Sequence, residues 1–389
     1  MIILMRDAGV QGGAILMQAM EILRAITWQM VAMWAIGGVL IYLAIKKEME
    51  PALLLPMGFG AILVNLPFSG ALTQIFEGAA EEGIIDLLYK AGISNELFPL
   101  LLFVGIGAMI DFAPLLSNPK MLLFGAAAQF GIFFTLGMAS LFGFGLKDAA
   151  SIAIIGAADG PTSIFVANFF KSSYTGAIVV AAYSYMALVP IVQPPVIRLL
   201  TTKKERMIRM RPASAHVSRT TRILFPIIVT MIAGIAAPRS VALVGMLMFG
   251  NLIRECGVLD SLSKTAQQVL VNLVTLLLGI SVAAKMRADL FVNPQTLMIM
   301  GLGLVAFVFD TAGGVIFAKV MNLFTRNKIN PMIGAAGISA FPMSARVVHK
   351  MGLEEDKGNF LLMHAIGANV SGQIASVIAG GMILSLIAR

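Results

Sequence analysis

Charged residues, cysteines and histidines are all scarce in this sequence of 389 residues. Charged side chains make up 12% of it, about half the roughly 25% of soluble domains, whereas 58% of the residues are hydrophobic and the mean hydropathy is +0.90. The single cysteine, Cys256, excludes a disulfide framework and a thiolate metal cage. Of the three histidines, no two stand four residues apart, which argues against a zinc or haem site. The composition therefore predicts a surface that mostly faces lipid.

Long polar stretches and basic residues interleaved with aromatic ones are also absent. The first absence predicts one continuous membrane domain, residues 28–389, after an N-terminal interfacial segment, residues 1–27. The second argues against a nucleic-acid partner, so we assign the net charge of +8 mostly to cytoplasmic loops. The N-terminus lacks a basic region followed by an apolar core and a small-x-small cleavage site, so we expect no signal peptide.

Ten apolar stretches indicate helices that cross a bilayer, which takes roughly 17–25 residues. Several of the ten are shorter than that. The segment Ser69–Ser94 is too polar to cross and predicts an amphipathic surface helix and a loop. The fold class is thus an all-α polytopic membrane protein. Its predicted spans are Trp28–Ile45, Pro51–Pro67, Leu97–Phe112, Met121–Phe144, Thr175–Ile197, Ile223–Ala237, Ser240–Ile253, Val269–Ala284, Thr296–Leu323 and Phe360–Ala388.

Two further stretches, Ala149–Phe170 and Asn330–Arg346, do not fit simple spans. Each has apolar flanks around a core rich in glycine, proline and serine. Non-helical backbone at membrane depth persists only where it is buried in protein or lines a cavity. Both stretches are therefore predicted to be broken or re-entrant helices.

The largest loop, residues 198–222, holds eight basic residues against one acid, Glu205. By the positive-inside rule this loop is cytoplasmic. If both interrupted stretches return to their own side, the ten spans place roughly twice as many basic residues on that side as on the other. This threading puts both termini outside.

The two interrupted stretches have similar surroundings, which suggests an internal repeat. In each unit a Gly-Ile pair comes first, then Asn-Pro, then a long apolar span and finally Ile-Gly-Ala-Ala. In the first unit Asn118-Pro119 precedes Ile155–Ala158, and in the second Asn293-Pro294 precedes Ile333–Ala336. The two units, about 97–197 and 269–388, begin five spans apart, so they are inverted. Inverted repeats with broken helices are typical of transporters. The alternative is chance recurrence in a chain rich in glycine and alanine.

Asp159 lies in the first interrupted stretch, between apolar residues. A carboxylate at the centre of a span costs roughly 3 kcal/mol and by default indicates an ion or proton pathway. Pro161 breaks the helix, and Gly160 allows the backbone to approach a ligand. Freed carbonyls and the hydroxyls of Thr162 and Ser163 are ligands for a hard cation such as sodium. The alternative is a surface aspartate that caps the helix beginning at Thr162.

The second stretch offers Asn330, Gly334, Ser339 and Arg346. Gly334 gives close packing, and Ser339 gives a hydroxyl; for both residues, small-residue helix packing is the simpler interpretation. Arg346 is either an interfacial arginine that snorkels to the surface or a group that binds an anionic carboxylate. In the last span, Asn369 is a neutral oxygen donor in an apolar helix and needs a partner.

Tyr183 and Tyr185 fall in the middle of the span Thr175–Ile197. Buried tyrosine hydroxyls find hydrogen-bond partners, so a structural role is the commoner one. Either hydroxyl is also a candidate proton donor.

These motifs together resemble the beta subunit of the sodium-translocating, biotin-dependent decarboxylases, which act on oxaloacetate, methylmalonyl-CoA or glutaconyl-CoA. The resemblance covers the chain from about Trp28 to its C-terminus. The residues that carry it are Ala157-Ala-Asp-Gly-Pro-Thr-Ser163, Tyr183-Ser-Tyr185, Asn330-Pro-x-x-Gly334, Ser339, Pro342-Met-x-x-Arg346 and His364-Ala-x-Gly-x-Asn369.

The resemblance implies a subunit that receives carboxybiotin, decarboxylates it with consumption of a proton and exports sodium. By likeness, Tyr185 would take part in proton delivery and Arg346 would handle the carboxylate, so both would meet the biotin group. Asp159 would serve both the chemistry and the ion. The implied sodium site comprises Asp159, Asn330, Ser339 and Asn369, with Gly334 in support.

The resemblance also implies partners: carboxyltransferase and biotin-carrier subunits and a small gamma/delta-type membrane subunit. It further implies trimeric beta subunits, an elevator-like motion and a prokaryotic inner membrane. No biotinyl domain is present, because Ala284-Lys285-Met286 matches the biotin-attachment turn only weakly, so biotin must come from another chain. Two alternatives stay open: an autonomous sodium/proton antiporter and a non-catalytic anchor for a soluble enzyme.

Overall fold

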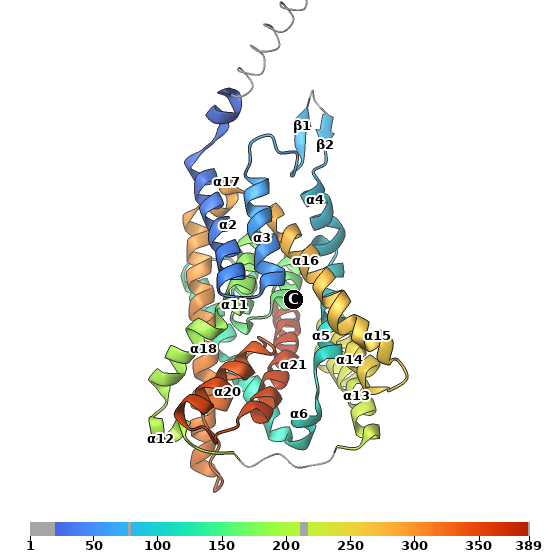
Figure 1. Cartoon of the computed structure of the whole chain (residues 1–389), viewed down its shortest axis with the longest axis vertical. Helices are drawn as coiled ribbons and strands as arrows, with labels where there is room; N and C mark the ends of the chain where they lie inside the picture. The colour runs from blue at the N-terminus through green and yellow to red at the C-terminus, as the bar shows by residue number, and fades with distance from the viewer. Residues whose placement is uncertain (1–19, 77–78, 211–216, 388–389) are drawn as a thin grey trace, which may run out of the picture.

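The computed structural model describes residues 20–76, 79–210 and 217–387. The predicted interfacial segment lies outside the described residues up to position 19, and residues 20–25 are helical. Figure 1 shows a bundle of helices with one two-stranded hairpin at one end and α12 and α20 near the other. The hairpin strands are β1 (Gln74–Phe76) and β2 (Ala79–Glu81).

Helices dominate the described residues, as the all-α prediction requires. Six are long and apolar enough to cross a membrane, or seven if a bent pair counts as one span. The α-helices are α2 (Trp28–Lys46), α3 (Pro51–Val64), α4 (Ile84–Leu88), α5 (Leu97–Met109), α6 (Ala113–Ser117), α7 (Leu122–Ala128), α8 (Phe130–Leu141), α9 (Leu146–Ala153), α10 (Gly160–Phe169), α11 (Thr175–Leu200), α12 (Lys203–Arg206), α13 (Arg219–Ala236), α14 (Val241–Glu255), α15 (Asp260–Thr265), α16 (Val271–Val282), α17 (Ala288–Phe291), α18 (Pro294–Phe324), α19 (Met332–Ala335), α20 (Met343–Glu355) and α21 (Leu362–Ile387).

Short 3-10 and π segments extend several of these helices. They are η1 (Tyr89–Ser94), η2 (Pro119–Met121), η3 (Ile154–Ala157), η4 (Pro238–Ser240), η5 (Ala266–Leu270) and η6 (Ala283–Lys285). All ten predicted spans correspond to helices, but α13 and α14 are not among those long and apolar enough to cross a membrane, and α3 has only 14 residues. Such a helix is too short to cross a bilayer alone. It pairs with α2 through Gly37 and Gly58, where an added Cβ would lie 2.7 and 2.6 Å from the other glycine's carbonyl oxygen.

The prediction of an amphipathic surface helix and a loop over Ser69–Ser94 is only partly right. The acidic residues Glu81 and Glu82 fall in or beside the exposed β1–β2 hairpin. That leaves Ile84–Ser94 apolar enough to join α5 as one broken span, bent by 59°. The charged residues therefore lie mainly in the first half of Ser69–Ser94 and the apolar residues in the second half. The average polarity of the whole segment concealed this division.

Both interrupted stretches are broken helices, as predicted. In the first, α9 and η3 end at Ala157, and α10 begins at Gly160. In the second, α19 ends at Ala335, and α20 begins at Met343. A long helix precedes each break and another follows it, α18 and α21 in the second unit, so the two units share one order of elements. This arrangement brings two non-helical segments into the interior.

Glycines let neighbouring helices approach closely. At the crossing of α5 and α14, an added Cβ on Gly107 would lie 1.8 Å from the Leu247 carbonyl oxygen, and one on Gly250 would lie 1.9 Å from that of Val104. Small residues at helix crossings allow this backbone approach in membranes. The crossing therefore has no room for a methyl group.

We expect Gly250→Ala to lower the free energy of unfolding by about 1–3 kcal/mol, because the methyl group must displace the backbone of α5. Gly301→Ala is the matched control, since nothing lies within 4 Å of its added Cβ. It should leave stability unchanged or raise it slightly. Thermal unfolding in detergent measures both variants, and equal shifts would contradict the packing argument.

Candidate functional site

The two helix breaks meet through a pair of hydrogen bonds. The backbone N–H and the Oγ of Ser339 both donate to the carbonyl oxygen of Ala157, at 3.2 and 2.6 Å. Ala158 follows with φ of +51°, a left-handed conformation that is uncommon for alanine and turns the chain into the break. The second break therefore satisfies a carbonyl that the first one leaves without a helical partner.

Asp159 lies at this junction and is 3% exposed. Its Oδ2 accepts hydrogen bonds from the hydroxyls of Thr162 at 2.7 Å and Ser376 at 3.0 Å. Its Oδ1 accepts the weaker backbone bond from Thr162, at 3.4 Å, as the N-cap of α10. Asp159 thus caps a helix, as the alternative interpretation held, but it does so in the interior of the protein.

One face of α21 supplies the rest of the polar cluster. The amide of Asn369 donates to the Ile338 carbonyl at 2.6 Å, and that of Gln373 donates to the Ser339 carbonyl at 2.7 Å. With Ser376 these residues are spaced four and then three apart, which places them on one helix face. The oxygens Asn369 Oδ1 and Gln373 Oε1 are buried and have no hydrogen-bond partner. Free oxygens beside a buried carboxylate favour a hard cation.

A cavity of about 160 Å³ adjoins Asp159. Its polar lining comes from Asp159, Tyr183, Ser339, Gln373 and the half-buried Glu50, and the remaining walls are mostly apolar. The Tyr183 hydroxyl is buried without a partner, and its ring lies so close to Gly160 that an added Cβ there would sit 2.1 Å from it. The cavity therefore holds a carboxylate and a phenol in largely apolar surroundings.

The structure brings Asp159, Ser339 and Asn369 together, as three of the predicted site residues. It places Tyr185 elsewhere, because its hydroxyl donates to the Met300 carbonyl in α18. Arg346 is exposed on α20, and its charge acts on Glu50, which lines the cavity. Gly334 packs on α18, where an added Cβ would lie 1.9 Å from the Gly314 carbonyl oxygen.

Sequence reasoning missed three residues of the cluster: Glu50, Gln373 and Ser376. Gln373 and Ser376 had a readable signal, because they continue the polar face of Asn369 at helical spacing. Glu50 lies in the turn between α2 and α3 and had no local signal.

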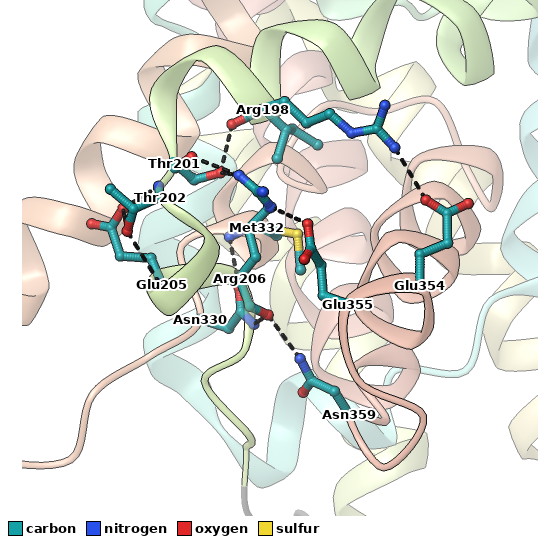
Figure 2. Close-up of polar contacts among 11 residues, drawn as sticks. Arg198, Thr201, Thr202, Glu205, Arg206, Asn330, Met332, Glu354, Glu355 and Asn359 are labelled. Carbon is teal, nitrogen blue, oxygen red and sulfur yellow. Dashed lines mark hydrogen bonds and ion pairs between the residues drawn. The ribbon is translucent and has the colours of Figure 1, made fainter.

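Asn330 lies with the basic loop and makes no hydrogen bond to the Asp159 cluster. Its Nδ2 donates to the carbonyls of Arg206 and Ile208, at 2.8 and 2.9 Å, and its Oδ1 accepts from Met332 N at 3.1 Å. Asn359 also donates to the Arg206 carbonyl, at 2.9 Å. Figure 2 shows these amides gathered on one turn of the loop.

Ion pairs hold the same loop to the end of α20. Arg206 Nε lies 2.6 Å from Glu355 Oε1, with the two side chains 13% and 18% exposed. Arg198 and Glu354 pair at 3.2 Å but are 58% and 47% exposed. The Arg209 guanidinium hydrogen-bonds to Asp356 and holds the pKa of that carboxyl below its usual range. Arg206 is the buried anchor of this contact (Figure 2).

A buried carboxylate and free oxygens at the crossing of two broken helices define a polytopic membrane protein that handles a small cation. The particular family follows from residues 29–387, which match the Na+-transporting oxaloacetate decarboxylase beta subunit. The chain belongs to this family, whose members are the membrane subunits of sodium pumps. It is a multi-pass protein of the bacterial plasma membrane.

Curated relatives with different names share this similarity. The oxaloacetate decarboxylase beta chain of Haemophilus ducreyi is 46% identical, over 96% of this chain and 98% of the relative. The glutaconyl-CoA decarboxylase subunit beta of Acidaminococcus fermentans is 48% identical, over 93% and 94%. The methylmalonyl-CoA decarboxylase subunit beta of Veillonella parvula is 49% identical, over 91% and 92%. The near-equal identities do not single out one substrate.

We expect Arg206→Met to lower the free energy of unfolding by about 1–3 kcal/mol, because Glu355 then loses its partner in a mostly buried position. Arg198→Met is the matched control and should change it by less than about 0.5 kcal/mol, since its pair is exposed. Thermal unfolding in detergent compares the two. Equal effects would show that Arg206 does not anchor the loop.

Proposed function

We propose that this chain decarboxylates carboxybiotin delivered by a partner and couples the reaction to sodium export. The observation that carries the proposal is the buried Asp159 at the junction of the two breaks, with the free oxygens of α21 and an apolar cavity beside it. Membership of the sodium-transporting family supports the same reading.

The proposed sodium ligands are Asp159, Ser339 and Asn369, as expected from the sequence, together with Gln373. Gly334 supports them by keeping α19 close against α18. Asn330 contributes from outside the cluster in this conformation, because its amide holds the basic loop to the segment that leads into the second break. Its proposed role is therefore to position the second break.

Decarboxylation of carboxybiotin breaks the bond between the carboxylate carbon and the ureido nitrogen. Carbon dioxide leaves, the electron pair stays on the nitrogen, and a proton neutralises that nitrogen. An apolar cavity favours the loss of charge from the carboxylate, and a positioned acid supplies the proton. We propose that the exposed Arg346 receives the carboxylate at the surface of α20, before the reaction.

The resemblance assigned the proton to Tyr185, and the geometry favours its neighbour. The Tyr183 hydroxyl lines the cavity with Asp159, whereas the Tyr185 hydroxyl is engaged with the Met300 carbonyl. We therefore propose that Tyr183 delivers the proton to the cavity, and that Tyr185 has a structural role against α18.

Coupling follows if sodium and a proton compete for Asp159. Sodium occupies the carboxylate before export, and the proton that replaces it is the one the reaction consumes. Moving one unit charge against 100 mV costs about 2.3 kcal/mol, which the decarboxylation must supply. An elevator-like movement of the paired breaks would carry the ion across.

The relatives are beta chains of decarboxylases with several subunits. We propose that this chain likewise works with carboxyltransferase and biotin-carrier subunits and a small gamma/delta-type membrane subunit, as a homotrimer. The carboxyltransferase selects the acid or acyl-CoA, so this chain meets only the biotin group and sodium.

The test is to reconstitute the chain with its partner subunits in sodium-free vesicles, add carboxybiotin, and follow carbon dioxide release as sodium is added. We expect release that sodium stimulates and that Asp159→Asn abolishes. Asp289→Asn, which removes an exposed carboxylate, is the control and should behave like the unchanged protein. Release indifferent to sodium would refute the pump, and sodium/proton exchange without carboxybiotin would favour the antiporter.

The two tyrosines make a second, matched comparison. We expect Tyr183→Phe to slow carbon dioxide release by about 10²-fold or more, as for loss of a general acid. Tyr185→Phe removes only the hydrogen bond to Met300 and should cost about 1 kcal/mol of stability with little loss of rate. The opposite order of effects would return the proton to Tyr185.

A further inference from the structure

A second carboxylate, Asp310, is buried in the middle of α18 and takes no part in the cluster around Asp159. Its side chain is 0% exposed, and no ion pair joins it to a basic residue in the described part of the chain. Its neighbours in the sequence form a continuous apolar helix. A charged group at this depth by default indicates a pathway for ions or protons.

One oxygen of Asp310 is fully engaged. Its Oδ1 accepts from the backbone N–H of Ile132 at 3.2 Å, and the carboxylate also accepts from that of Gly131. Both N–H groups belong to the first turn of α8, which begins after an interruption at Gln129. Helix N-termini stabilise negative charge, so these N–H groups are suitable partners for a carboxylate oxygen. The simplest interpretation is that Asp310 only caps α8.

The other oxygen argues for more than a cap. Asp310 Oδ2 is buried and has no hydrogen-bond partner, and the same holds for Gln129 Oε1, Thr135 Oγ1 and Thr311 Oγ1. Each of these residues lies within one helical turn of the contact between Asp310 and Ile132. Asp310 Oδ2 belongs to a buried carboxylate without a basic partner, and a cation beside it would offset the desolvation energy that burying the charge costs.

Glycines make room for the carboxylate on two sides. An added Cβ on Gly131 would lie 2.6 Å from Oδ1, and one on Gly156 would lie 2.6 Å from Oδ2. Gly156 belongs to η3, the segment that leads into the break with Asp159. The free oxygen of Asp310 therefore faces the back of the same broken helix whose tip carries Asp159.

The predicted repeat relates the position of Asp310 to a position in the first unit. Asp310 follows Asn293 by 17 residues, and Thr135 follows Asn118 by the same number. The two positions are equivalent in the predicted repeat and lie on α8 and α18, which pack together, and only the second unit carries a charge there.

We propose that Asp310 is a second cation site of the membrane domain, at which the free oxygen binds a small monovalent cation, sodium or a proton, during the pump cycle. The inference rests on the proposed function and deepens it. The bound cation neutralises the carboxylate behind η3, so its arrival and departure act on the helix that presents Asp159.

The test uses the full chain with its partner subunits in vesicles and the variant Asp310→Asn. Asparagine keeps an oxygen that accepts from Gly131 and Ile132, and it removes the charge. We measure radioactive sodium moved and protons consumed for each carbon dioxide released. The expected result is a fall in one of these two ratios by about one cation per turnover. Asp289→Asn again serves as the control.

The outcomes separate the alternatives. A lower sodium ratio assigns the site to sodium, and a lower proton ratio assigns it to a proton. Unchanged ratios overturn the inference and leave Asp310 as a cap of α8. If the unchanged protein itself shows no sodium-dependent turnover, the proposed function fails before this question arises.

A second variant guards against misfolding. If Asp310→Asn does not accumulate in the membrane, Asp310→Glu retains the acid and displaces it by one methylene. The proposal then requires a several-fold change in the sodium or proton concentration that gives half-maximal turnover. Values equal to those of the unchanged protein would refute it.

Discussion

Backbone polar groups inside a membrane must find partners within the protein, and the whole site is a consequence of that constraint. The first break frees the Ala157 carbonyl, and Ser339 of the second break satisfies it. The second break frees the carbonyls of Ile338 and Ser339, and amides of α21 satisfy those. Each of these side chains uses one polar atom to donate a hydrogen bond to a freed carbonyl. The remaining oxygens of Asn369 and Gln373 have no hydrogen-bond partner, so they are available to the proposed sodium site.

The sequence allowed the breaks and their central carboxylate to be predicted, because each break combines glycine, proline and polar residues within a short apolar stretch, whereas a proline or glycine alone leaves helices such as α11 continuous. It could not show where side chains point. The resemblance implied that Asn330 and Asp159 share one sodium site, yet Asn330 turns to the basic loop. Tyr183 and Tyr185 stand two residues apart on a helix, so they face different sides, and the choice between them needed α18 and the cavity in place. Asp310 was readable as an intramembrane charge but lacked a helix breaker beside it.

Two buried carboxylates, those of Asp159 and Asp310, lie close to the short η3 segment. Asp159 lies two residues after the η3 segment, at the start of α10, and Asp310 faces Gly156 within η3. Only the end of η3 and the break separate Gly156 from Asp159 along the chain, so an electrostatic change at one carboxylate lies close to the other. The proposed chemistry in the cavity and the proposed ion site at the break are thus close enough to act on one another without a long relay.

The hydrogen bonds that join Ser339 to Ala157 also bear on whether the protein transports ions as a carrier or as a pore. Segments that meet across 182 residues of sequence are tied at their tips, so the proposed sodium ligands would move as one body. An ion held there cannot hop from site to site through a continuous opening. It has to wait for the body to move. The flux should therefore follow the steep temperature dependence of a conformational change and saturate at modest rates, as in a carrier and unlike a pore.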